Sequence, residues 1–196
     1  QSDLITYNVA ISACGKSESW WWRALGLLDE MREHGIAHDV ITGSAAISAC
    51  ERGATWKQAF DFLRETARSS LELGVIAFSA AISACEKGEC WPTALALLAD
   101  MERKVLKPDV IAYSAAVSAC EKGEQWQGAL RLLVVLLQSS LRLDGILQNA
   151  AISACSRGGQ WPQAFELLTD MLQNHIQTDV ITYNAAISAC EKCREW

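Results

Sequence analysis

Helix-breaking residues are scarce in this chain, which has three prolines in 196 residues. Hydrophobic residues make up 51% of the chain, and many of them are alanine and leucine. This composition favours closely packed helices. No run reaches the roughly 18 uncharged apolar residues expected of a membrane span. No signal or transit peptide is visible at the start, Gln1-Ser2-Asp3.

Motifs for catalysis are also missing. The sequence has no glycine-rich phosphate loop, no nucleophile–base motif and no cluster of carboxylates. It also lacks the H-x-E and P-C-x-x-C signature of zinc deaminases. We therefore predict no catalytic residue and no cofactor. The three histidines, His34, His38 and His175, share no motif and are predicted to be solvated loop residues.

What the sequence does contain is a repeat. The segment AAISAC occurs five times, once with a substitution, and a sixth time as VAISAC. The cysteines that end these segments are Cys14, Cys50, Cys85, Cys120, Cys155 and Cys190. The first interval is 36 residues, the next four are 35, and a tryptophan follows each cysteine by six residues. A fixed period of this length indicates a solenoid.

The cysteine positions argue against a secreted disulfide scaffold, although eight cysteines are present. Six of them occupy one equivalent helical position, where a small buried apolar residue fits. We expect free thiols in a reducing compartment. Cys190 and Cys193 form a C-x-x-C, but no second pair lies at zinc-like spacing, so no metal site is predicted.

Residues Val75–Asp109 illustrate one repeat. A first helix is expected over Phe78 to Glu86, with Gly88 just past its end. Pro92 suits the first turn of a second helix, which carries a wide apolar stripe and is broken at Lys107-Pro108-Asp109. Stacking such hairpins buries a continuous core. The predicted fold is therefore an all-α, right-handed solenoid of helix–turn–helix repeats, with the first helices on its concave side.

The period divides the chain into residues 4–39, 40–74, 75–109, 110–144, 145–179 and a partial repeat at 180–196. The first repeat has one extra residue, which we place in Trp20-Trp21-Trp22-Arg23 at the start of its second helix. The chain begins at a repeat boundary and stops inside a repeat, so it is expected to be an excerpt of a longer protein. Neither end has a polar capping helix, which predicts self-association through the ends.

Five short motifs resemble those of the pentatricopeptide repeat family in its 35-residue P-type form. They are Asp100-Met101, Lys107-Pro108-Asp109, Val110-Ile111-Ala112-Tyr113-Ser114, Lys122-Gly123 and Ala129-Leu130. The resemblance covers essentially the whole chain. The sequence departs from the family where Leu136 replaces a methionine and where only Pro108 precedes a terminal aspartate.

The resemblance implies binding of single-stranded RNA, with one base per repeat. It implies that the fifth and last residues of each repeat select the base: Asn8 with Asp39, Ser44 with Gly74, Ser79 with Asp109, Ser114 with Asp144, Asn149 with Asp179, and Asn184 without a partner. Asparagine and serine also suit helix N-capping, which is the alternative explanation of the fifth residue.

The second residue of every repeat is isoleucine: Ile5, Ile41, Ile76, Ile111, Ile146 and Ile181. The resemblance implies that these side chains stack on the bases, one from each of two adjacent repeats. The alternative is a β-branched residue that faces the core at the start of a helix.

One further position is always basic: Lys16, Arg52, Lys87, Lys122, Arg157 and Lys192. A cation in every repeat could contact the phosphates of a bound strand. Alternatively, it could favour the helix C-terminus through the helix dipole. The formal net charge of −6 argues against nucleic-acid binding on a simple count, so the distribution of charge matters more.

Carried onto these pairs, the family's base preferences predict the site 5′-U-N-G-G-U-Y-3′, read from the amino end of the chain. The resemblance also implies a role in organellar RNA processing, stability, editing or translation. It therefore implies a mitochondrial or chloroplast location. A helical scaffold that binds a protein or peptide is the competing function, because solenoid surfaces also bind peptides.

Overall fold

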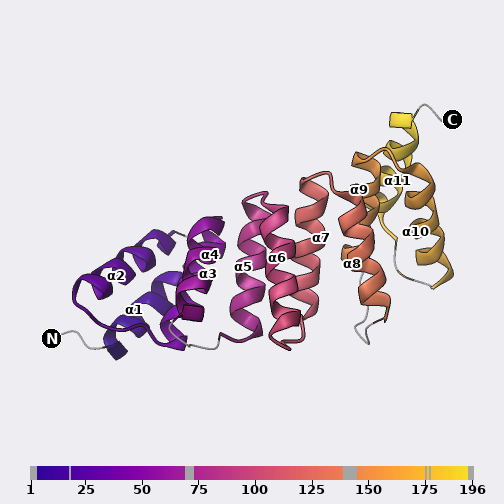
Figure 1. Cartoon of the computed structure of the whole chain (residues 1–196). Helices are drawn as coiled ribbons and strands as arrows, with labels where there is room; N and C mark the ends of the chain where they lie inside the picture. Colours follow the sequence, from indigo (N-terminus) through magenta and orange to yellow (C-terminus); the bar gives the residue numbers. More distant parts are fainter. Residues whose placement is uncertain are drawn as a thin grey trace. The chain divides into compact units, whose positions relative to one another are not determined.

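The computed structural model describes residues 4–17, 19–68, 73–138, 145–174, 176 and 178–193. Across these ranges every regular element is an α-helix and no strand occurs, which confirms the predicted all-α class (Figure 1). No helix in them is both long and apolar enough to span a membrane. The helices are α1 (Leu4–Gly15), α2 (Trp21–Glu33), α3 (Val40–Arg52), α4 (Trp56–Arg68), α5 (Val75–Lys87), α6 (Trp91–Arg103), α7 (Val110–Lys122), α8 (Trp126–Gln138), α9 (Gly145–Arg157), α10 (Trp161–Gln173) and α11 (Val180–Cys193).

The chain divides into two compact units, Gln1–Ala112 and Tyr113–Trp196. Within the first unit, α3 packs against its hairpin partner α4 and against the first helices of both neighbouring repeats, α1 and α5. Within the second unit, α9 packs in the same way against α10 and α11. Each hairpin thus covers the apolar face that its neighbour leaves open, as expected of a solenoid.

The helix boundaries differ in detail from those expected. In the third repeat α5 begins at Val75 rather than Phe78, and α6 ends at Arg103, before the Lys107-Pro108-Asp109 segment. Val105 adopts a φ of 58°, and the N–H of Leu106 donates to the carbonyl of Met101 at 2.9 Å. These are the features of a Schellman motif, so the helix is closed by backbone geometry before the proline is reached.

The glycine that follows the first helix in repeats two to five has a role that the sequence did not reveal. Gly88 has a φ of −89°, and the left-handed residue is the next one, Glu89, with a φ of 55°. A Cβ on Gly88 would lie 2.2 Å from Cδ1 of Trp56, the tryptophan of the preceding repeat. Gly158 meets Trp126 at the same distance, and Gly53 meets Trp21 at 2.5 Å. Glycine is therefore required by the space that the tryptophan ring occupies at the junction of adjacent hairpins.

Gly88→Ala is expected to lower the free energy of unfolding by about 1–3 kcal/mol, because the added methyl group must displace the Trp56 ring. The measurement is urea denaturation followed by circular dichroism. Gly26→Ala is the matched control, since nothing lies within 4 Å of its added Cβ in the middle of α2. It should stabilise the protein by about 0.5–1 kcal/mol. Equal effects of the two changes would contradict the steric explanation.

The extra residue of the first repeat lies in the turn, which corrects its expected position at the start of the second helix. Here α1 ends at Gly15 and α2 begins at Trp21. Trp21, and not Trp20, contacts the glycine of the following repeat. Trp20 and Trp22 are exposed, and their rings stack with centroids 6.4 Å apart.

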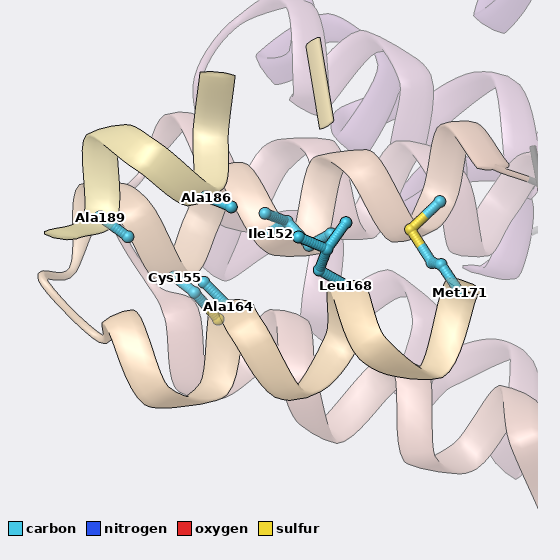
Figure 2. Packing of buried hydrophobic residues seen from close by; sticks show 7 residues of the cluster. All are labelled: Ile152, Cys155, Ala164, Leu168, Met171, Ala186 and Ala189. Carbon is cyan, nitrogen blue, oxygen red and sulfur yellow. The ribbon is translucent and has the colours of Figure 1, made fainter. Parts of the chain in front are cut away.

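Four of the six repeat cysteines, Cys50, Cys85, Cys120 and Cys155, are buried as free thiols, and Cys14 and Cys190 are partly buried. In the second unit Cys155 packs with Ile152 of α9, Ala164, Leu168 and Met171 of α10, and Ala186 and Ala189 of α11 (Figure 2). Burial raises the pKa of Cys50, Cys120 and Cys155 to about 11 and that of Cys85 to about 12. These thiols stay protonated at neutral pH and act as small apolar side chains.

The expectation of solvated histidines is only partly correct. His34 is exposed at the end of α2, whereas His38 is half-buried in the loop before α3. Burial lowers the pKa of the His38 imidazole, with a smaller opposing effect from Glu65. His175 lies outside the described residues.

Candidate nucleic-acid interface

The isoleucine at the second position of each repeat is exposed in all six repeats. The exposed fractions are 72% for Ile5, 60% for Ile41, 78% for Ile76, 62% for Ile111, 71% for Ile146 and 63% for Ile181. The alternative that these side chains face the core is therefore wrong. An apolar side chain held in solvent at the same point of every first helix is available to a ligand.

The fifth and last residues of a repeat are joined by hydrogen bonds. Asn8 Nδ2 donates to Asp39 at 3.0 Å, Ser79 Oγ donates to Asp109 at 2.9 Å, and Asn149 Nδ2 donates to Asp179 at 3.3 Å. These are the three predicted pairs that have an aspartate within the described residues. Asp144, the partner of Ser114, lies outside them. Gly74 has no side chain to offer Ser44, and Asn184 is exposed on α11.

The aspartates, and not the asparagines or serines, cap the helices. The backbone N–H groups of Thr42, Ala112 and Thr182 each donate to the aspartate three residues earlier at 2.8 Å. Asn8, Ser79 and Asn149 lie one turn inside their helices. The N-capping explanation of the fifth residue is therefore wrong, because the cap belongs to the last residue of the preceding repeat.

These contacts lower the pKa of Asp39 and Asp179. At Asp39, burial acts to raise the pKa, but hydrogen bonds from Thr42 and Asn8 outweigh it and lower the pKa. At Asp179, hydrogen bonds from Thr182 lower the pKa. A carboxylate with a lowered pKa accepts hydrogen bonds at neutral pH and fixes the side chain that donates to it.

Two threonines complete this arrangement and were missed in the sequence. The hydroxyl of Thr42 donates to Oδ1 of Asn8, and that of Thr182 donates to Oδ1 of Asn149. Each threonine is the third residue of the repeat after its asparagine. A comparison of the third residue with the fifth residue of the preceding repeat would have revealed the link.

The six cations at the equivalent position form what we call the basic ladder. They are exposed wherever their side chains are described, but some of them lie beside carboxylates. Lys87 Nζ lies 3.3 Å from Oε1 of Glu51, and Arg157 lies 3.5 Å from Glu121. Each carboxylate belongs to the preceding repeat, where it directly precedes that repeat's own cation. The side chain of Lys192 lies outside the described residues. Carboxylates between repeats thus compete for cations that phosphates would need.

An open groove between α1 and α3 brings the predicted groups together. It has a volume of about 640 Å³ and is lined by Ile5, Asn8, Lys16, Asp39 and Ile41, among others. An adjoining depression of about 500 Å³ continues past Ser44 to Arg52. The groove places an isoleucine from each of two repeats, a polar pair and a cation around one space. That combination suits a flat ring with polar edges and an attached anion.

Comparisons with known proteins agree with this architecture. The model described as "PPR repeat" matches residues 5–36, and the model described as "PPR repeat family" matches residues 146–192. A chloroplastic pentatricopeptide repeat-containing protein of Arabidopsis thaliana is 42% identical over 62 residues, which is 32% of this chain and 8% of that protein.

Solved structures extend the similarity over the whole chain. The crystal structure of the maize pentatricopeptide repeat protein PPR10 matches 98% of this chain and 28% of its own, with a TM-score of 0.67 and 26% identity. The structure of PPR10 in complex with an 18-nt psaJ RNA element matches 96% of this chain and 26% of its own, with a TM-score of 0.55 and 25% identity. This chain therefore spans only about a quarter of the maize protein and less of the Arabidopsis relative. Residues 5–36 and 146–192 of this chain are therefore pentatricopeptide repeats.

Proposed function

We propose that this chain binds single-stranded RNA along the face that carries the isoleucine row. The observation that carries the proposal is the hydrogen-bonded pair of fifth and last residues beside exposed isoleucines in one groove. The complex of maize PPR10 with an RNA element supports it, because that protein shares the repeat. The face offers stacking surfaces and polar groups, and the proposed activity is binding without chemistry.

The arrangement supports recognition of one base per repeat. Isoleucines from adjacent repeats would hold each base between them, and the fifth residue would meet the base edge. An asparagine amide can pair with a uracil edge, whereas the smaller serine leaves room for a purine. With the family's preferences the proposed site is 5′-U-N-G-G-U-Y-3′, in which the second repeat discriminates poorly because it has Gly74 in place of an aspartate. Since a similar protein is chloroplastic, we propose that this site lies in an organellar transcript.

Selection of bound RNA from a random pool tests the proposal directly. We expect enrichment of U at the first and fifth positions and of G at the third and fourth. Fluorescence anisotropy with the enriched sequence and with versions changed at one base then gives the preference at each position. Binding with no base preference would reject the modular proposal.

A peptide-binding scaffold is the second candidate, and one observation favours it. Carboxylates pair with ladder cations in both units, so the face is less basic than the cations alone suggest. The isoleucine row would also suit an apolar peptide. Failure of the random pool to yield any bound RNA, together with capture of peptides from a displayed peptide library, would favour this function.

The role of the basic ladder can be measured through salt. Six cations on single-stranded RNA predict a log–log slope of affinity against salt of at most about −4. Lys87→Ala with Lys122→Ala should weaken all sequences alike and reduce the slope by about 0.7 for each cation. Glu51→Gln should instead strengthen binding by roughly two- to five-fold, because it releases Lys87 from a surface ion pair. If neither change alters the affinity, the cations do not contact RNA and only stabilise the C-terminal ends of their helices.

A further inference from the structure

The third residue of each repeat varies in step with the fifth residue of the repeat before it. Asn8 and Asn149 are the two asparagines at the fifth position whose next repeat begins within this sequence. The third residue of that next repeat is threonine in both cases, Thr42 and Thr182. The three serines at the same position are followed by apolar residues, with Ser44 before Ala77, Ser79 before Ala112 and Ser114 before Leu147. The two positions lie 33 or 34 residues apart, so the link arises only where neighbouring repeats meet.

The structure shows the contact in both units. The Thr42 hydroxyl lies 2.5 Å from Oδ1 of Asn8 and 2.7 Å from Asp39, while Nδ2 of Asn8 donates to Asp39 at 3.0 Å. The equivalent distances for Thr182, Asn149 and Asp179 are 2.6, 2.8 and 3.3 Å. Both threonines are completely buried. The same triad therefore forms twice, in two separate parts of the chain.

The triad allows one orientation of the asparagine amide. A carboxylate only accepts hydrogen bonds, so the group that faces Asp39 must be Nδ2. The single proton of the Thr42 hydroxyl is shared between Asp39 and Oδ1 of Asn8. Reversal of the amide would set Oδ1 against the carboxylate and lose the bond to Asp39, while the bond between the amide and the threonine hydroxyl would change direction. The second proton of Nδ2 then remains for a ligand, and the occupied Oδ1 is a weaker acceptor.

We propose that Thr42 and Thr182 are positioning residues that hold a donor toward the base and so help repeats one and five select a pyrimidine carbonyl. The proposal rests on the proposed RNA binding. It explains the apolar third residues after serine, because a serine side chain carries a single polar group and has no amide to orient. The specificity of a repeat is then divided between three residues, one of them contributed by the next repeat.

The first test replaces both threonines with valine, which keeps the branched shape and removes the hydroxyl. We expect the ratio of affinities for U over G at the first and fifth RNA positions to fall about three- to ten-fold, the worth of one hydrogen bond. Preferences at the third and fourth positions should stay unchanged. Thr42→Ser with Thr182→Ser keeps the hydroxyls and should restore the ratio.

The readout separates positioning from stability. Loss of the threonine hydroxyl also removes its contact with the N-cap, so the melting temperature of the valine variant should fall in either case. A purely structural role would weaken all RNAs alike and leave the U-to-G ratio intact, which would overturn the inference. A wild-type protein without any preference at these positions would instead reject the proposed function, and this inference with it.

A second test adds the contact where it is absent. Ser79→Asn with Ala112→Thr creates the triad with Asp109, and Ser79→Asn alone lacks the hydroxyl. The double variant should prefer U over G at the third position about three- to ten-fold more strongly than the single variant. Ala112 is buried like both threonines, so circular dichroism must first show that the double variant is folded. Equal preferences in two folded variants would overturn the inference.

Discussion

Ser79→Asn is expected to change the preferred third base of the RNA from G to U and to leave the other positions unchanged. The single proton of the Ser79 hydroxyl is shared between Asp109 and the carbonyl of Val75 in its own helix. An asparagine can keep the bond to Asp109 and extend its amide further toward the base. One good base contact gives about 1–3 kcal/mol of discrimination in groove recognition, so we expect a change of similar order. Competition binding with RNAs that differ only at the third base measures it.

The second repeat provides the matched control for this change. Ser44→Asn introduces the same amide, but Gly74 has no carboxylate to orient it, so little new preference should appear at the second base. Adding Gly74→Asp should create a preference for U. Gly74 caps α5 in an extended conformation, and nothing lies within 4 Å of the position that its Cβ would occupy, so an aspartate fits there. A change of preference at every position together would contradict the modular proposal.

Ile41→Ala with Ile76→Ala is expected to weaken RNA binding without loss of stability. Both side chains are exposed, at 60% and 78%, so their removal costs the folded state little. Stacking on aromatic side chains contributes about 1–3 kcal/mol per base, and isoleucine, without a π face, should lie near the lower end. Two changes then predict a loss of roughly 30-fold in affinity. Anisotropy titrations and thermal denaturation of the same sample measure both effects.

Ile82→Ala is the control for the isoleucine row. Ile82 lies on the same helix as Ile76 but is completely buried. Its truncation leaves a cavity and should cost about 2–5 kcal/mol of unfolding free energy. If the Ile41 and Ile76 changes destabilise the protein to the same extent, these residues contribute to the fold and not to a binding face. Unchanged RNA affinity in the stable double variant would contradict their stacking role.

The periodicity of the sequence was sufficient to predict the architecture of paired helices. A fixed interval with small, apolar and turn-forming residues at constant places predicts paired helices, because each such preference acts within one or two helical turns. Pro92 in the first turn of α6 and the buried cysteines follow from local rules of this kind. The same periodicity is enough to align the second, fifth and last residues of the repeats with one another.

Contacts between repeats could not be predicted from the periodicity of the sequence. Gly88 was expected to end a helix, yet the ring of Trp56, thirty-two residues earlier, is what requires a glycine there. The tryptophan six residues after Cys14 is Trp20. The helix α2 begins one residue later, however, and it is Trp21 that contacts Gly53 of the next repeat. The ladder cations were recognised, but their carboxylate partners lie in the preceding repeat.

The sequence by itself determined that this protein is a stack of helix pairs and which positions recur on each pair. Only the tertiary structure decided which recurring positions meet: Asp39 with Asn8, Thr42 with both, and Glu51 with Lys87. Helix formation depends on residues a few positions apart, whose spacing the sequence shows directly. Pairing between repeats depends on the rotation and separation of neighbouring helices. That geometry is fixed by the packing of whole side chains in the core, which no local pattern specifies.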